Sequence, residues 1–146
     1  MKKSTVMVSG LALVLLAVLL GAPGCSKTPM SEKPDSVVLQ GSWKGQETNA
    51  TGSDSLVLSG TNLEMHGADP REWYKATFTL LEDKNPKQMV VTITECPDPK
   101  YVGKTAYAIY QIAQDGTFTI AAHAPGDTNV PASFDDPQAR KVVFKQ

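Results

Sequence analysis

The side chains that could do chemistry in this chain are few and widely spaced. The two histidines, His66 and His123, are 57 positions apart, and neither belongs to an HxH or HxxxH pair. A zinc site needs three or four converging ligands, whereas each histidine has one carboxylate nearby in the sequence, Asp69 or Asp127. We therefore expect both histidines to lie on the surface or in turns, and we expect no metal site.

Cys96 and the remaining carboxylates form no recognised catalytic set. Cys96 lies between Glu95 and Pro97, which matches no cysteine-hydrolase signature, and no serine has a G-x-S-x-G context. Calcium loops place acidic or amide residues at alternate positions, a pattern that Asp135 and Asp136 lack. An enzyme would need a histidine beside Cys96, or clustered carboxylates, in one cleft. The sequence therefore predicts a protein that is not an enzyme and uses no cofactor.

The first 24 residues have the order of an export signal. Lys2 and Lys3 supply positive charge, and the run Leu11–Leu20 contains no polar residue. At a rise of ~1.5 Å per residue, this run spans roughly half of a ~30 Å hydrocarbon core. We therefore interpret residues 1–24 as a signal peptide that is removed from the mature protein.

The cleavage region, Ala22-Pro23-Gly24-Cys25, resembles a bacterial lipoprotein signal, in which small residues precede a cysteine. This resemblance implies that Cys25 carries lipid and anchors the protein to a membrane. By resemblance to sorted lipoproteins of two-membrane bacteria, Ser26 in place of an aspartate implies the outer membrane, with the protein facing the periplasm. Two alternatives stay open: an ordinary secretory signal, which would allow a Cys25–Cys96 disulfide, or an uncleaved anchor.

The rest of the chain divides into a tether and one domain. Residues 25–36 are polar and contain two prolines, so we expect a flexible tether followed by a monomeric folded domain over residues 37–146. Without Lys2 and Lys3, the chain has 12 basic and 15 acidic residues, a net charge of −3. This charge excludes a basic surface for nucleic acid.

The domain consists of short β-rich runs separated by Gly, Pro, Asn and Asp. In Glu72–Leu81, apolar residues alternate with lysine and threonine, which is the period of a half-buried strand. Asp115-Gly116 predicts a hairpin, and Asn85-Pro86 predicts a turn. Eight antiparallel strands with local turns favour an up-and-down barrel, which has no exposed edges, or a sandwich. The expected strands are Gln40–Thr48, Ser55–Ser59, Asn62–His66, Glu72–Leu81, Gln88–Glu95, Thr105–Ile112, Thr117–Ala122 and Lys141–Lys145.

The motif Gly41-x-Trp43 at the head of the first strand resembles the opening motif of lipocalins. The resemblance implies a small eight-stranded antiparallel barrel of the lipocalin-like (calycin) type. In such a barrel Trp43 closes one end, and a basic residue of the last strand, Lys145 or less favourably Arg140, packs over it. Further pieces resemble small, exported bacterial lipocalin-like domains of no established function: Leu39–Trp43, Asn85–Lys87, Gly103, Ile109-Tyr110, Asp115, Thr117–Ile120, Pro125-Gly126, Pro131, Phe134 and Val142–Lys145.

Four aromatic residues, Tyr74, Phe78, Tyr110 and Phe118, are expected on the inner wall of the barrel together with Ile120. They either fill a packed core or line a small cavity that binds one small apolar ligand. The small residues Ala106, Ala108, Ala121 and Ala122 leave room for a cavity, whereas the short domain favours a packed core. Ligand binding inside the barrel requires a cavity above roughly 300 Å³.

A different function is a structural or protein-interaction module of the cell envelope. Such a module would have a packed barrel and an exposed apolar patch of several hundred Å². The long segment Ala124–Arg140 offers Val130, Pro131 and Phe134 for this patch. The sequence leaves both the ligand-binding and the interaction alternatives open.

Overall fold

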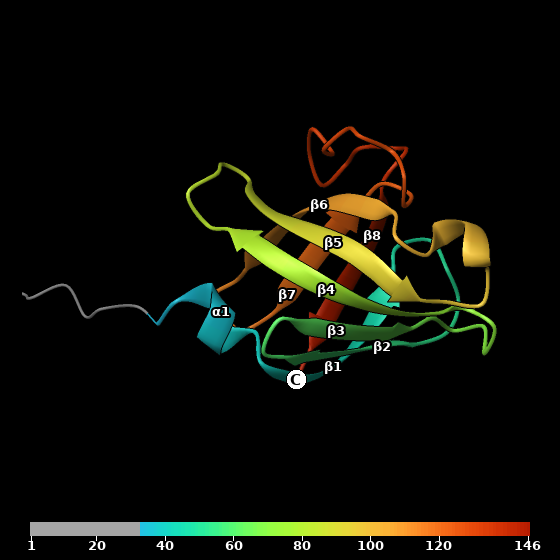
Figure 1. Cartoon of the computed structure of the whole chain (residues 1–146). Coiled ribbons are helices and arrows are strands. Elements are labelled where there is room, and N and C mark those ends of the chain that lie inside the picture. The colour runs from blue at the N-terminus through green and yellow to red at the C-terminus, as the bar shows by residue number, and fades with distance from the viewer. Residues whose placement is uncertain (1–32) are drawn as a thin grey trace, which may run out of the picture. The chain divides into compact units, whose positions relative to one another are not determined.

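Eight antiparallel strands close into a barrel in the computed structural model, which describes residues 33–146 (Figure 1). Each strand pairs with the next along the chain, and the last pairs with the first. The strands are β1 (Gly41–Glu47), β2 (Asp54–Ser59), β3 (Asn62–His66), β4 (Trp73–Leu81), β5 (Lys87–Glu95), β6 (Thr105–Ile112), β7 (Phe118–Ala122) and β8 (Arg140–Lys145), with helical turns α1 (Asp35–Val38) and η1 (Pro99–Tyr101). The predicted all-β fold, an eight-stranded antiparallel barrel, is confirmed.

The compact unit starts at Lys33, so α1 includes Asp35 and Ser36 from the end of the predicted tether. The predictions for the signal peptide, for lipid on Cys25 and for the tether up to residue 32 fall outside the described residues. Between residues 33 and 146, no helix has the length and apolar character needed to cross a membrane.

The wall of the barrel follows from alternation of side chains along each strand. In β2, Asp54, Leu56 and Leu58 are buried inside the barrel, whereas Val57 and Ser59 are exposed. Strand β4 shows the predicted alternation too, with a shift of register between Lys75 and Ala76. One apolar face per strand thus supplies the interior.

The turns at the end where α1 lies are short and locally specified. At the predicted hairpin between β6 and β7, Gly116 has a φ of 81°, and its N–H donates to the carbonyl of Ala113 at 2.9 Å. The Asp115 carboxylate accepts the N–H of Thr117 at 2.9 Å. An Asp-Gly pair suits such a turn because Gly tolerates a positive φ and Asp bonds the backbone two residues on.

The end of the barrel at α1 is filled by aromatic and aliphatic side chains. Phe118 is fully buried, and its ring centroid lies 5.4 Å from that of Trp43 and 6.1 Å from that of Tyr110. Phe144 stacks on Phe118 with centroids 5.9 Å apart. The Trp43 indole N–H donates to the carbonyl of Leu39 at 2.9 Å. These contacts bury large rings with their polar group satisfied, and they close this end.

A buried carboxylate joins α1 to the closed end. Asp35 Oδ2 accepts hydrogen bonds from Lys87 Nζ at 2.6 Å and from Tyr110 Oη at 2.8 Å. The backbone N–H of Asp35 donates to Glu82 Oε2 at 3.2 Å. The first turn of the described chain is therefore part of the barrel's closure.

Two glycines of β1 have conformational or steric reasons to be glycine. Gly41 has a φ of 117°, which a residue with a Cβ rarely adopts. A Cβ on Gly45 would lie 2.7 Å from Phe144 Cε1 and 2.9 Å from the carbonyl oxygen of Val143. Gly45 thus leaves space for the Phe144 ring to lie across the interior.

The long segment between β7 and β8 covers part of the outer wall. Ile109 and Ala121 are register partners on outward-facing positions, yet both are fully buried. Lys141, the partner of Ala121 on β8, forms an ion pair with Asp135 of this segment at 3.2 Å. The segment therefore folds back over this face, as the orange and red loop beside β6 and β8 shows (Figure 1).

The apolar residues expected to form an exposed patch on this segment are not exposed. Pro131 is buried, and Val130 and Phe134 are half-buried. This segment therefore does not present the expected exposed patch at these three residues.

Candidate ligand-binding site

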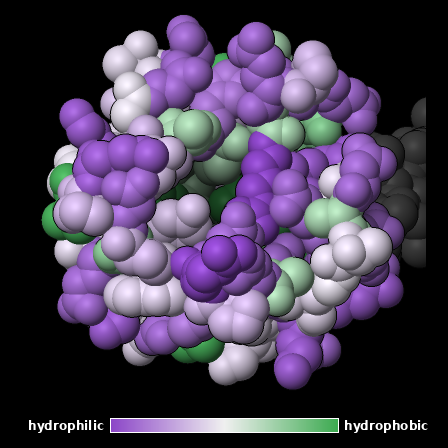
Figure 2. Space-filling model, turned by 90° about the vertical axis from the view of Figure 1, so that its right-hand side faces the viewer, coloured by the Kyte–Doolittle hydropathy of each residue, from purple (hydrophilic) through white to green (hydrophobic). Residues whose placement is uncertain are grey.

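The end of the barrel opposite α1 contains a cavity of about 320 Å³. Figure 2, which views this end, shows hydrophobic residues deep in a hollow that hydrophilic residues surround. The lining residues are mostly apolar: Leu56, Leu63, Met65, Tyr74, Val91, Ile93, Tyr101, Ala106, Ala108, Ile120, Ala122, His123, Ala124, Pro125, Gln138, Arg140, Val142 and Phe144. Its volume lies at the lower limit of ligand-binding pockets, which span ~300–1,000 Å³.

Small side chains on two neighbouring strands create the cavity. Ala106 and Ala108 of β6 and Ala122 of β7 all line it. Phe144 forms its boundary toward the packed half, where this ring stacks on Phe118. The barrel is therefore both packed and hollow: aromatic rings fill the half at α1, and alanines leave the other half open.

The four predicted ligand-binding aromatics do not lie together. Tyr74 lines the cavity. Tyr110 and Phe118 belong to the aromatic cluster of the closed end, and Phe78 is packed in the core with 6% of its surface exposed. Of the four, the structure thus brings Tyr74 alone to the cavity.

The residues predicted to close the barrel have different environments. Trp43 is buried in the closed end, and Gly41 begins the strand that carries it. Lys145 is exposed and lies opposite Lys44 on the outer wall, because its neighbour Phe144 faces the interior. The contacts of Trp43 come from Leu39 and Phe118.

Arg140, the less favoured alternative for closing the barrel, lies at the open end among three carboxylates. Its Nε donates to Glu47 Oε2 at 2.7 Å. Its Nη2 is 3.6 Å from Asp54 Oδ1 and 3.6 Å from Glu72 Oε2. Three negative charges thus surround one positive charge, and the Arg140 side chain, which is 30% exposed, lines the cavity.

Asp54 is the most unusual member of this group. It is 3% exposed, and its Oδ2 has no hydrogen-bond partner within the described chain. A buried carboxylate oxygen without a donor is costly, so most such atoms in proteins have one. Its position on an inward-facing site of β2, followed by Leu56 and Leu58, is the sequence signal that could have drawn attention to it.

A second, polar cavity of about 300 Å³ adjoins the first at Arg140, which lines both. This polar cavity lies between the β1–β2 and β3–β4 loops. Its lining residues are Glu47, Ala50, Thr51, Gly52, Asp54, Ala68, Asp69, Glu72 and Arg140. Arg140 is therefore the residue common to the apolar cavity and the polar one.

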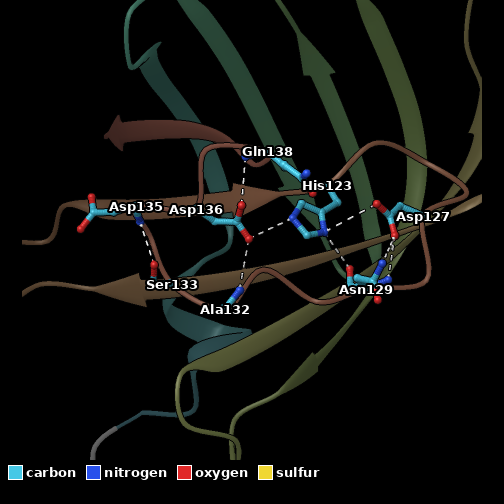
Figure 3. Close-up of polar contacts among 8 residues, drawn as sticks. All are labelled: His123, Asp127, Asn129, Ala132, Ser133, Asp135, Asp136 and Gln138. Carbon is cyan, nitrogen blue, oxygen red and sulfur yellow. Dashed lines mark hydrogen bonds and ion pairs between the residues drawn. The ribbon is translucent and has the colours of Figure 1, made fainter.

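His123 organises the segment that follows β7, with Asp127 and Asn129 on one side and Asp136 on the other (Figure 3). Its Nδ1 lies 3.0 Å from the carbonyl oxygen of Asn129, and its Nε2 lies 3.2 Å from Asp136 Oδ2. Both partners of the ring are hydrogen-bond acceptors, one a backbone carbonyl and the other a carboxylate. His123 is buried, unlike the exposed His66, and it contributes to the cavity wall.

Burial and hydrogen bonding shift the acidity of several groups near the open end. Burial raises the pKa of the Tyr74 phenol. Backbone N–H groups lower the pKa of two carboxyls in the β7–β8 segment, that of Asn129 acting on Asp127 and that of Gln138 acting on Asp136. These two carboxylates are therefore held in their charged form beside His123.

The polar contacts of the other residues that could do chemistry are with residues close to them in the sequence. Cys96 forms no disulfide with any described residue, and its Sγ donates to the carbonyl of Asp98 at 3.0 Å. His66 contacts Glu64 Oε1 at 2.8 Å on the surface. Within residues 33–146, no three side chains of His, Cys, Asp or Glu are grouped to hold a metal ion.

Comparisons of the chain with models of protein families, with curated proteins and with solved structures found no match. The function must therefore be inferred from the geometry of the barrel. That geometry provides an apolar chamber for an apolar group, with a polar, net acidic rim at one side of the opening.

Proposed function

We propose that this protein is a non-catalytic binding module that holds one small apolar ligand inside its barrel. The observation that carries this proposal is the cavity of about 320 Å³, lined mainly by apolar side chains and closed at the opposite end by the Trp43 cluster. Burial of apolar surface contributes about 0.8 kcal/mol per CH₂, so a ligand of about eight to ten carbons gains enough to bind detectably.

The binding of n-octanol tests this function, because octanol is apolar along its length and carries no charge. We expect it to shift the NMR signals of residues that line the cavity. Ala106→Leu, which fills the cavity, should weaken binding at least about tenfold without strain, since the added methyl groups enter empty space. The matched control Ala113→Leu, at an exposed position of the β6–β7 turn, should leave binding unchanged. Absence of octanol binding, or equal binding by Ala106→Leu, would overturn the proposal.

We further propose that lipid on Cys25 anchors the module at the outer membrane, facing the periplasm. The sequence Ala22-Pro23-Gly24-Cys25 supports lipidation, and Ser26 supports the outer membrane. Native mass spectrometry of the full chain from its own cells should show a lipidated Cys25. An unmodified Cys25, or retention of residues 1–24, would refute this anchor.

A further inference from the structure

The open end contains an acceptor that lacks a donor. Asp54 Oδ2 is buried and unpartnered within residues 33–146, and Asp54 lines the polar cavity that adjoins the apolar one. Its other oxygen lies 3.6 Å from Arg140, which is longer than a hydrogen bond. A positive charge brought close to this carboxylate would offset part of the cost of its unpaired oxygen.

The charges around Asp54 decide which headgroup is favoured. Arg140 already donates to Glu47 at 2.7 Å, and Glu72 and Asp54 lie on its other side. One of the three carboxylates therefore neutralises the Arg140 guanidinium before a ligand arrives. The other two carboxylates give the site a net negative charge. An anionic headgroup would be repelled, whereas a cationic one would be attracted, more strongly than in bulk water because the site is partly buried.

We propose that the ligand class of this barrel is the apolar amine. Its alkyl or aryl group occupies the apolar cavity, and its protonated amine lies beside Arg140 on the side of the polar cavity, where the negative charge of Asp54 attracts it. Glu72, whose side chain is 47% exposed and makes only a 3.6 Å contact with Arg140, supplies a second negative charge. This inference rests on the proposed function, and it adds the chemical class of the headgroup.

Three probes with eight carbons each separate the contribution of the headgroup to binding from that of the alkyl group: n-octylamine, n-octanol and n-octanoate at pH 7. The amine is protonated at this pH, as a lysine side chain is. Calorimetric titration of the full chain should show octylamine binding about tenfold more tightly than octanol, and octanoate more weakly than octanol. Octanol or octanoate binding as tightly as octylamine would overturn the amine proposal and leave the proposed function standing. Absence of octanol binding counts against the function itself.

Substitutions of the acidic residues test whether they cause the preference for octylamine. Asp54→Asn should reduce octylamine affinity about tenfold and leave octanol affinity unchanged, while Glu72→Gln should reduce it about threefold. Asp83→Asn makes the same change of charge on the β4–β5 loop, at the closed end, and should have no effect. If Asp54→Asn does not fold, as judged by circular dichroism, Glu72→Gln and the three probes still decide. Unchanged octylamine affinity in the folded acidic-site variants would overturn the proposal.

Discussion

At the scale of single residues, the hydrogen bonds of Asp35 stabilise the closed end of the barrel. Its Oδ2 is the acceptor for Tyr110, which is 1% exposed, and for Lys87. Asp35→Ala would leave the Tyr110 hydroxyl buried without an acceptor, so we expect a loss of about 2–4 kcal/mol in the free energy of unfolding. Tyr110→Phe should cost about 1 kcal/mol, because Asp35 keeps its bond to Lys87. Urea unfolding measures both, and additive costs in the double variant would contradict the predicted coupling.

The hydrogen bond from Tyr110 to Asp35 makes the stability of the protein depend on pH in the alkaline range. Burial, the bond to Asp35 and the negative charges of Asp35 and Glu82 raise the pKa of Tyr110 above its ordinary value of 10.0. The native state therefore favours the neutral phenol of Tyr110. The contribution of this phenol to the free energy of unfolding is complete below pH 10 and is lost progressively as the pH rises above 10. The stability advantage of the natural chain over Tyr110→Phe should shrink as the pH rises from about 9 to about 11. A constant difference over this range would show that Tyr110 does not contribute in this way.

At the scale of elements, the β7–β8 segment depends on two carboxylates beside His123. The N–H of Asn129 donates to Asp127 and that of Gln138 donates to Asp136, which lowers the pKa of each carboxyl below its ordinary value of 3.8. A lowered pKa means that the stabilisation is present above pH 3.8 and is lost as the pH falls through the lowered value. We expect the NMR signals of the Asn129 and Gln138 amides each to show a transition with a midpoint below pH 3.8.

Asp136→Asn provides the control for this element. It should remove the transition at Gln138 and at Ala132, whose N–H also contacts Asp136, and leave the transition of Asn129 in place. Midpoints at or above pH 3.8, or an unchanged Gln138 transition in Asp136→Asn, would show that these carboxylates do not hold the segment.

The strands were predictable because their signals are local. Alternation and turn residues such as Asp115-Gly116 lie within a few positions of the elements they specify. The bounds of β3 (Asn62–His66) and β6 (Thr105–Ile112) match their predicted ranges, and the other strands differ by one residue at one or both ends. These signals left a barrel and a sandwich open; closure into a barrel removes the two exposed edges that an open sheet would have.

The candidate site was less predictable because it joins residues that are far apart in the sequence. Arg140 and Glu47 are separated by 93 positions, and Asp35 and Tyr110 by 75. Alternation assigns Tyr74 and Tyr110 to the same interior, but it gives no depth along the barrel axis. The alanines of β6 and β7 were the informative signal for the cavity, and their neighbours in space were needed to see it.

At the scale of the whole barrel, the two halves have different tasks. The half at α1 is packed and carries stability, because aromatic rings and the Asp35 carboxylate close it. The other half is hollow and has its polar groups at the rim, which suits it to binding. Such a division implies that equal substitutions should have unequal costs at the two ends.

Strand β2 offers a matched pair to test this division. Leu56 is 2% exposed and Leu58 is 1% exposed, and both face the interior, but Leu56 lines the cavity whereas Leu58 packs in the core beyond it. The cost of Leu→Ala rises with the volume of the new void and with how tightly its surroundings are packed, so we expect about 4 kcal/mol for Leu58→Ala and about 2–3 kcal/mol for Leu56→Ala. Urea unfolding with unchanged slopes would measure the difference. Equal costs would mean that the open half is as tightly packed as the closed half, and the ligand site would lose its physical basis.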